Sequence, residues 1–246
     1  MATHFALAFH AAGCRVVEVC ARNIDHAAAL AAQVGAQAVS GPAELDTAVD
    51  FCIVAVNDDA LPAVAGQLHL PHSVTVHTSG ATEAEVLRGV SPHYGVLWSP
   101  MSFVRQEAMD YSSLPFCIEG SDAAAADAVE RLARRVSGRV CRMDAGQRRW
   151  AHLSATVVNN FGNAMLAEVQ RMAAQERLPF DLLLPIVNQT AQRAALDNLW
   201  SRQTGPAVRQ DRNTIAAHRA MLAGHPRMLE LYDVFTRLIA DRDSSQ

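Results

Sequence analysis

The chain has 246 residues, half of them hydrophobic, and a formal net charge of −4 at pH 7. This composition can supply a substantial buried core for one large or two modest domains, and it excludes a disordered chain. The charge, with no stripe of basic residues, argues against nucleic acid or an anionic membrane as the main partner, since both require clustered Lys or Arg. We expect a small neutral or acidic ligand.

The absence of several sequence features from the chain excludes further classes of function. No stretch approaches the ~20 apolar residues of a membrane span, and no charged N-terminal region precedes a cleavage site, so we expect a cytoplasmic protein. Five scattered cysteines form no C-x-x-C pair, which indicates neither a disulfide framework nor a metal site. The 21 basic residues are all arginine. Without lysine, Schiff-base chemistry and a lysine general acid are excluded.

Residues 1–144 alternate between helical and strand-like patterns. We expect helices at about 2–12, 25–34, 62–68 and 122–136, and strands at 15–20, 51–56, from 73, 95–99, 115–120 and 139–143. The strands are continuous apolar runs, which are typical of a sheet buried on both faces. The pattern predicts an α/β domain with a doubly wound parallel sheet, whose ligands bind at the carboxyl ends of the strands.

After Asp144 the strand-like patterns stop. A long helical pattern runs over residues 146–176 and ends before Leu178-Pro179. Further helices are expected at about 181–199, 209–223 and 226–241. Residues 145–246 are therefore predicted to form a second, all-α domain.

Two short segments that follow predicted strands are candidate cofactor contacts. Arg22 and Asn23 lie where a dinucleotide-binding fold contacts the adenosine ribose, and an arginine there favours the 2′-phosphate of NADP over NAD. The alternative is an ordinary solvated arginine. Val56, Asn57 and Asp58 end the next buried strand and begin its loop. The Asn and Asp can cap the following helix, contact the cofactor, or do both.

The segment "HTSG", residues 77–80, ends the next strand in the same way. Thr78, Ser79 and Gly80 are predicted to contact the cofactor, with Gly80 where the backbone approaches a ligand closely. Ser79 is also a candidate substrate contact. A nucleophilic role for Ser79 is disfavoured because the chain has no G-x-S-x-G elbow.

Three polar residues on the long helix are the candidate catalytic group. At ~100° per residue, His152, Asn160 and Asn163 fall on roughly one helix face. A histidine can donate a proton to a carbonyl that is being reduced, and two amides can orient it by hydrogen bonds. The alternative is a set of buried polar groups satisfied within the helix packing.

The segment "TGPAVRQD", residues 204–211, predicts a turn that opens a helix, with Pro206 fixing the entry. Arg209 is a candidate clamp for a substrate carboxylate, and Asp211 can hold Arg209 or His152 in place. A structural salt bridge between Arg209 and Asp211 is the alternative.

Several motifs, in order, resemble a family of Rossmann-like proteins that carry a C-terminal helical domain of unknown function, DUF2520. They are "VNDDALP", "VHTSG", "HYGVLWSPMSF", "LPFCIEG", the "NFGN" that follows His152, "LPFDLLLP" and "TGPAVRQD". The family is related to deazaflavin-dependent NADP oxidoreductases and pyrroline-carboxylate reductases. The resemblance implies an NADP-dependent oxidoreductase, often a homodimer through the helical domain, and it leaves a deazaflavin open as a further cofactor.

Members of that family begin with a strand and a loop similar to G-A-G-N-V-A-T-H, and this chain starts at the valine of that motif, with Met1 in its place. The use of arginine without lysine suggests a GC-rich gene, in which GTG encodes valine and also initiates translation. We expect that about thirty residues precede Met1, with the first strand and the glycine loop. As written, the sheet lacks that strand, and the cofactor pyrophosphate lacks its backbone cradle.

Together these features predict hydride transfer between NADP(H) and a small carbonyl, imine or 2-oxo acid. In this hypothesis His152 exchanges the proton, Asn160 and Asn163 position the substrate, and Arg209 binds an acidic group. The alternative is a non-catalytic dimer that binds a nucleotide or metabolite in the same cleft.

Overall fold

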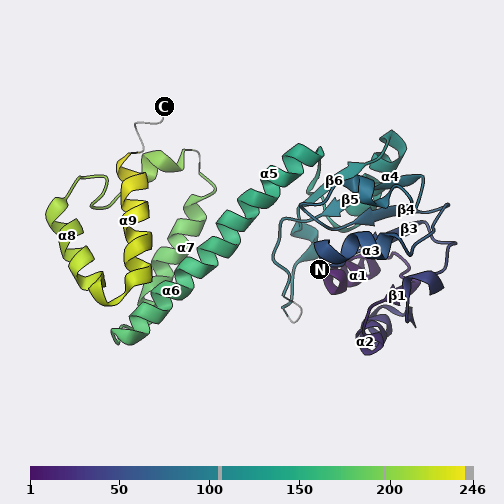
Figure 1. Cartoon of the computed structure of the whole chain (residues 1–246), viewed down its shortest axis with the longest axis horizontal. Helices are drawn as coiled ribbons and strands as arrows, with labels where there is room; N and C mark the ends of the chain where they lie inside the picture. Colours follow the sequence, from purple (N-terminus) through teal and green to yellow (C-terminus); the bar gives the residue numbers. More distant parts are fainter. Residues whose placement is uncertain (105–106, 197, 242–246) are drawn as a thin grey trace. The chain divides into compact units, whose positions relative to one another are not determined.

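The structure is a computed structural model that describes residues 1–104, 107–196 and 198–241. The chain divides into two compact units, Met1–Asn159 and Asn160–Gln246. The first combines strands with helices and the second is built from helices (Figure 1). Residue 144, where we expected the domain boundary, lies directly before helix α5 (Ala145–Ala155), and this helix belongs to the first unit.

The strands of the first unit form two hydrogen-bonded sheets. They are β1 (Glu18–Cys20), β2 (Gln37–Val39), β3 (Phe51–Val54), β4 (Val74–His77), β5 (His93–Trp98), β6 (Phe116–Gly120) and β7 (Val140–Arg142). β1 pairs with β2, and β3 to β7 form a five-stranded sheet in chain order. Strand β2 is three residues long and was missed by the sequence analysis, because so short a run has no detectable period.

The larger sheet is parallel except for one pair. β5 and β6 run antiparallel, whereas the other neighbouring strands are parallel. The expectation of an entirely parallel sheet is therefore corrected at β6. The connection between β5 and β6 contains the short 3₁₀ turn Tyr111–Ser113 and no crossover helix among its described residues. A parallel pair would need such a crossover, whereas an antiparallel pair does not.

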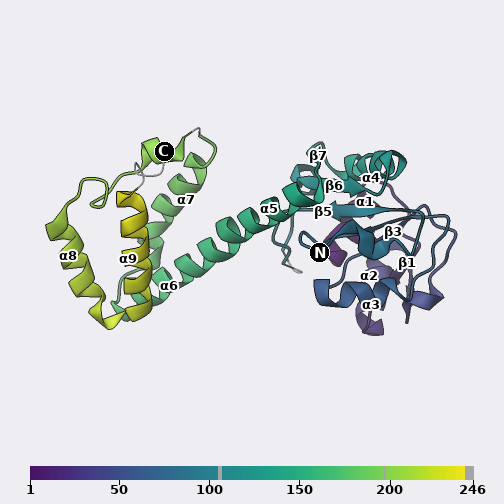
Figure 2. The same ribbon diagram turned by 45° about the horizontal axis from the view of Figure 1, so that its top comes forward.

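Both faces of the five-stranded sheet are buried, as predicted from the continuous apolar strands. Val96 of β5 packs with residues of α3 (Leu61–Ala65), and the next residue, Leu97, packs with α1 (Ala2–Ala11) and α4 (Ala123–Val136). Successive side chains of a strand point to opposite faces, so one strand supplies both cores. The elements that form the two cores are seen in Figure 2.

Side-chain caps set the starts of the helices that matter for the site. The Asn23 side chain accepts hydrogen bonds from the backbone N–H groups of Asp25 and His26 and so begins α2 (Ile24–Val34). At α5, Asp144 and Gln147 form a reciprocal capping box. This box satisfies two backbone donors that the helix would leave unpaired, and it fixes the register of every residue on α5.

The long helical pattern is helical as expected, but it is not α-helical throughout. Residues Thr156–Phe161 are π-helical, between α5 and α6 (Gly162–Gln175). A π-helical turn holds more residues than an α-helical one. The count of 100° per residue, which placed His152, Asn160 and Asn163 on one face, does not apply across this segment.

The helical unit also contains α7 (Leu184–Arg193), α8 (Arg212–Met221) and α9 (Pro226–Ala240). α7 is shorter than the expected helix at 181–199, and Asn198 beyond it has a positive φ of 51°. α8 begins at residue 212 because the Asp211 side chain caps it by accepting from the N–H of Thr214. Among the described residues, no helix has the length and apolar character needed to cross a bilayer.

Candidate functional site

The candidate site lies at the carboxyl ends of the central strands of the first unit. Val54, His77 and Val96 are in register across β3, β4 and β5. The residues that follow them therefore share one edge of the sheet, which is where ligands bind in doubly wound folds. After β3, Asn57 and Asp58 are exposed, and the Asn57 side chain forms no cap for the short helix that follows.

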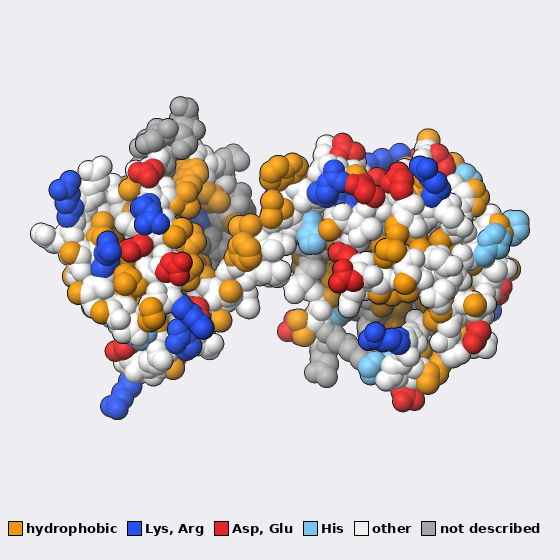
Figure 3. Space-filling view, in the orientation of Figure 1, with side chains coloured by type: hydrophobic (Ala, Val, Ile, Leu, Met, Phe, Trp, Pro, Cys, Tyr) orange, Lys and Arg blue, Asp and Glu red, His pale blue; other side chains and the backbone are white. Residues whose placement is uncertain are grey.

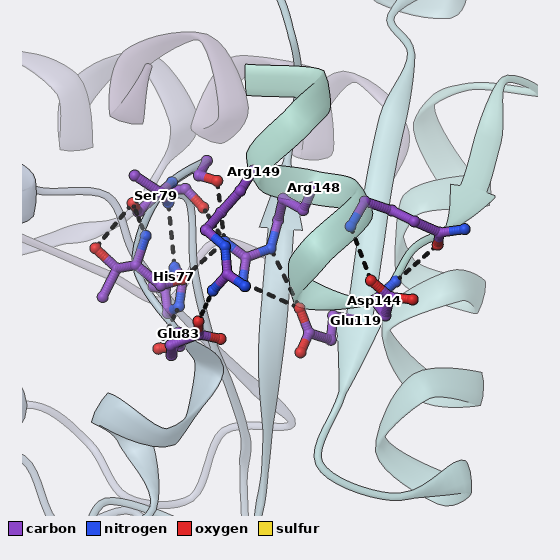
Figure 4. Close-up of polar contacts among 11 residues, drawn as sticks. His77, Ser79, Glu83, Glu119, Asp144, Arg148 and Arg149 are labelled. Carbon is purple, nitrogen blue, oxygen red and sulfur yellow. Dashed lines mark hydrogen bonds and ion pairs between the residues drawn. The ribbon is translucent and has the colours of Figure 1, made fainter. Parts of the chain in front are cut away.

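The loop after β4 is held by its own side chains. Nδ1 of His77 accepts a hydrogen bond from the N–H of Ser79 at 3.1 Å, and Nε2 donates to the carbonyl of Glu83 at 3.3 Å. The Ser79 hydroxyl accepts from the N–H groups of Ala81 and Thr82 and donates to the Thr82 hydroxyl. These bonds, drawn in Figure 4, fix residues 79–82, which we call the 79–82 loop.

Arg148 binds the 79–82 loop from α5. Its guanidinium is 1% exposed, and its Nη1 donates to the carbonyls of Ser79, Gly80 and Thr82 at 3.3, 3.1 and 2.7 Å. Nε and Nη2 donate to one carboxylate oxygen of Glu119, at 3.2 and 3.1 Å (Figure 4). A buried charge is tolerated when it is paired and its donors are satisfied, and this guanidinium meets both conditions.

His152 lies one helical turn after Arg148 and packs against the same loop. A Cβ atom at Gly80 would lie 2.5 Å from Nδ1 of His152 and 2.9 Å from Cε2 of Trp98. The His152 ring stacks on Trp98 with centroids 5.7 Å apart and an interplanar angle of 25°. Nδ1 of His152 is buried and has no hydrogen-bond partner among the described residues. In this structure the close approach at Gly80 is made by the His152 ring.

His77 is held in its neutral form. Burial and, to a smaller extent, the nearby Arg148 guanidinium lower the pKa of this histidine to about 4, against the opposing effect of Asp58. With Nδ1 accepting and Nε2 donating, the proton of the neutral ring lies on Nε2. His77 therefore organises the loop and is a poor proton donor near neutral pH.

The predicted cofactor contacts are at two places in the first unit. Arg22 is exposed after β1, and it forms no ion pair within the part of the chain that the structure describes. Asn23 serves as the α2 cap. Val56 is 40% exposed after β3, whereas Thr78, Ser79 and Gly80 are buried, and the Ser79 hydroxyl is engaged in the 79–82 loop.

The other predicted site residues belong to the helical unit. Asn160 lies in the π-helical segment, and Asn163 on α6 lines an open hollow of about 230 Å³. In the turn before α8, Pro206 is half-buried and Arg209 is exposed. The Asp211 carboxylate caps α8 and also accepts a hydrogen bond from the Thr214 hydroxyl.

Two cysteines of the sheet strands have protonated thiols. Burial raises the pKa of the Cys52 and Cys117 thiols to about 11, which keeps both protonated near neutral pH. Within the described ranges, no cluster of His, Cys, Asp or Glu is arranged to hold a metal ion.

Sequence reasoning missed Arg148, Glu119 and Trp98. Arg148 could have been found, because it lies four residues before His152 and so shares its helix face. Glu119 and Trp98 carry no such signal, since only the pairing of β5 with β6 and the docking of α5 bring them to the loop.

Part of the chain matches a known protein family. The family model "Domain of unknown function (DUF2520)" matches residues 114–239. No protein with a curated description matches the chain. The chain is similar to a crystal structure from Bacteroides fragilis that is provisionally named an NADP oxidoreductase. The two are 34% identical, with a TM-score of 0.88 over 98% of this chain and 94% of that one.

More distant structures share the fold. An imine reductase from Myxococcus stipitatus in complex with NADP⁺ is 14% identical, with a TM-score of 0.65 over 100% of this chain and 91% of that chain. A reductive aminase from Aspergillus terreus in complex with NADPH and ethyl-5-oxohexanoate is 17% identical, with a TM-score of 0.68 over 98% and 91%. The Rossmann-like α/β fold followed by a helical domain is thereby confirmed.

The lowered pKa of His77 predicts a pH-dependent stability. An unfolded histidine binds a proton near pH 6.5, whereas the folded one resists it down to about pH 4. The unfolded state thus binds more protons in this window, so stability is fully present above 6.5 and falls as the pH drops toward 4. We expect a loss on the order of 3 kcal/mol from this residue.

Urea unfolding across that pH window checks this expectation. His77→Asn keeps an acceptor for the Ser79 N–H but cannot titrate, so its stability should depend less on pH than that of the unsubstituted chain. The exposed His72→Asn is the control and should keep the full slope. Equal slopes for His77→Asn and the unsubstituted chain would contradict the assignment.

Proposed function

The chain belongs to the DUF2520 family, and on this premise we propose that it transfers a hydride between NADP(H) and a small carbonyl, imine or 2-oxo acid. The observation that carries the proposal is the position of His152, whose imidazole ring packs against the 79–82 loop at the carboxyl edge of the sheet. Similarity to proteins named NADP oxidoreductase and imine reductase supports the reaction class.

The residues after β1 fit the adenosine end of NADP. Arg22 is an exposed guanidinium without an ion pair in the described chain, and the N-terminus of α2 follows it directly. Both favour a phosphate, the arginine through its fork of donors and the helix through its dipole. We propose that Arg22 and Asn23 bind the 2′-phosphate and that Val56, Asn57 and Asp58 border the ribose. NADPH, when bound, supplies the hydride.

His152 is the proposed proton donor for reduction. Its Nδ1 is buried against Gly80, which leaves the Nε2 side of the ring for a substrate. A neutral imidazole can carry its proton on Nε2 and give it to the oxygen or nitrogen atom of a reduced carbonyl or imine. In this proposal Thr78, Ser79 and Gly80 contact the cofactor, and Ser79 also contacts the substrate.

Asn160, Asn163 and Arg209 are the proposed substrate contacts. Asn160 and Asn163 offer amides that can orient a carbonyl or imine, and the exposed Arg209 offers a charge for an acidic group. Pro206 shapes the turn that carries Arg209. Asp211, engaged as the cap of α8, supports this turn from its other end. We include a deazaflavin in the proposal as a second hydride carrier, which the assay below tests as an acceptor.

A homodimer through the helical unit is part of the proposal. Among the described residues of this unit, the only buried apolar side chains are Ala173, Ala207 and Leu222. Large apolar side chains are exposed instead, such as Leu182 at 65% and Ile186 at 61%. Apolar side chains lie among charged ones over the visible face of this unit in Figure 3. A second copy is the partner that the proposal assigns to this surface.

Replacement of His152 tests the catalytic proposal. In an assay of NADPH oxidation with a panel of 2-oxo acids, small ketones and imines, and with a deazaflavin as acceptor, we expect turnover by the unsubstituted chain. His152→Ala should lower kcat by ~10²–10⁴-fold because a general acid is lost. The Kd for NADPH, measured by calorimetry, should change little.

The matched control is His69→Ala, an exposed histidine before the amino end of β4, which should retain full kcat. Binding of NADPH without turnover of any compound in the panel would favour a non-catalytic binding protein. Full activity in His152→Ala would remove this residue from the mechanism.

Replacement of Arg22 tests the choice of cofactor. Arg22→Ala should raise the Kd for NADP⁺ at least ~10-fold, since a hydrogen-bonded charge pair with the 2′-phosphate is lost. The Kd for NAD⁺ should stay the same. Arg15→Ala, an exposed arginine before the amino end of β1, is the charge-matched control. Equal effects of the two substitutions would leave Arg22 without a specific role.

Light scattering after size exclusion tests the dimer. A homodimer has a mass of about 53 kDa, twice the 26.5 kDa of the chain. Ile186→Asp should shift the protein toward a monomer, because it places a charge in the proposed apolar interface. Gln192→Glu, an exposed polar position on the same helix, should leave the mass unchanged. A monomeric unsubstituted chain would refute the proposal.

A further inference from the structure

Helix α5 meets the 79–82 loop at two points one helical turn apart. Arg148 holds three of the loop's carbonyl oxygens, and the ring of His152 rests on Gly80. Both residues are on the same face of α5, because they are four residues apart in an α-helix. Arg148 thus binds the 79–82 loop by hydrogen bonds, whereas His152 packs against it.

We propose that Arg148, held by Glu119, is the positioning residue that sets the orientation of His152. This inference rests on the proposed function, in which His152 exchanges the proton. Arg148 itself touches neither substrate nor cofactor in this account. It acts through the 79–82 loop, whose backbone forms the surface that the imidazole packs on.

The need for such a residue follows from how the His152 ring is held. A histidine that exchanges protons is usually oriented by a hydrogen bond to its other ring nitrogen. Here the buried Nδ1 lacks such a partner within the described residues. Packing between Gly80 and Trp98 is what constrains the ring, so its orientation is only as well defined as the position of Gly80.

The contacts of Arg148 fit a positioning role and exclude direct ligand binding. All three nitrogen atoms of the guanidinium are used by Glu119 or by loop carbonyls, and the side chain is 1% exposed. A phosphate or carboxylate of a ligand therefore cannot reach it. The neighbouring Arg149 differs in each respect, because it is 52% exposed and pairs only with Glu83 among the described residues.

This neighbour supplies the matched control for the first experiment. Arg148→Met should lower kcat ~10–100-fold in the NADPH oxidation assay, because a small displacement of a reacting group is that costly. The loss in kcat should exceed any change in the Kd for NADPH, because the Kd reports binding alone whereas kcat also depends on the orientation of His152. Arg149→Met should change neither. A kcat of Arg148→Met equal to that of the unsubstituted chain would overturn the proposal.

A second readout does not depend on activity. The stacking of His152 on Trp98 predicts that, in proton NMR of the unliganded protein, the ring current of Trp98 shifts the His152 ring protons, and His152→Gln should identify their signals. Arg148→Met should move these signals toward random-coil values, and Arg149→Met should leave them in place. If Arg148→Met leaves them in place in the folded protein, Arg148 does not orient the ring.

Two further variants keep the test decisive if Arg148→Met does not fold. Arg148→Lys keeps the charge beside Glu119 but cannot reproduce the fork of donors to the carbonyls. Gly80→Ala acts from the other side of the contact, because its Cβ would force the ring away. Both should shift the His152 signals, and unchanged signals in both would refute the proposal.

The two readouts separate failure of this inference from failure of the proposed function. If the unsubstituted chain oxidises no NADPH but Arg148→Lys and Gly80→Ala still move the His152 signals, the catalytic proposal fails and the positioning of the ring stands. If turnover is normal and unaffected by Arg148 substitutions, the positioning proposal fails and the enzyme proposal stands.

Discussion

The ion pair between the buried Arg148 and the partly buried Glu119 is the constraint on which the arrangement of the candidate site depends. A guanidinium removed from water is stable only when its charge is paired and its donors are satisfied. Glu119 supplies the charge, and the carbonyls of the 79–82 loop take the remaining donors. The capping box of Asp144 and Gln147 fixes the start of α5 and so places Arg148. Arg148 therefore connects the 79–82 loop, helix α5 and strand β6.

Much of the fold follows from the sequence because apolar patterns report burial directly. The continuous runs at β3, β4 and β5 indicated a sheet covered on both faces, and the two cores confirm it. Three features were not accessible in this way. β2 is too short to show a period, the direction of β6 depends on its connection, and the six-residue π-helical segment Thr156–Phe161 is too short to be told from an α-helix by its sequence.

The site was predictable only in its outline. The ends of β3 and β4 and the helix that carries His152 were marked by polar residues that follow or interrupt apolar runs. The contact between His152 and Gly80 could not be predicted from the sequence. It depends on the docking of α5, which long-range hydrogen bonds determine. The sequence suggested that a ligand approaches Gly80, whereas in the structure the ring of His152 does.

In the proposed function, NADP(H) binds at the carboxyl edge of the sheet, beside His152. The most direct test is a titration of NADPH into the protein, followed through the ring-proton NMR signals of its histidines. We expect the His152 signals to move with NADPH, whereas those of His225, buried in the helical unit, should not. Binding of NADPH that leaves the His152 signals unchanged would contradict it, as would the absence of any binding.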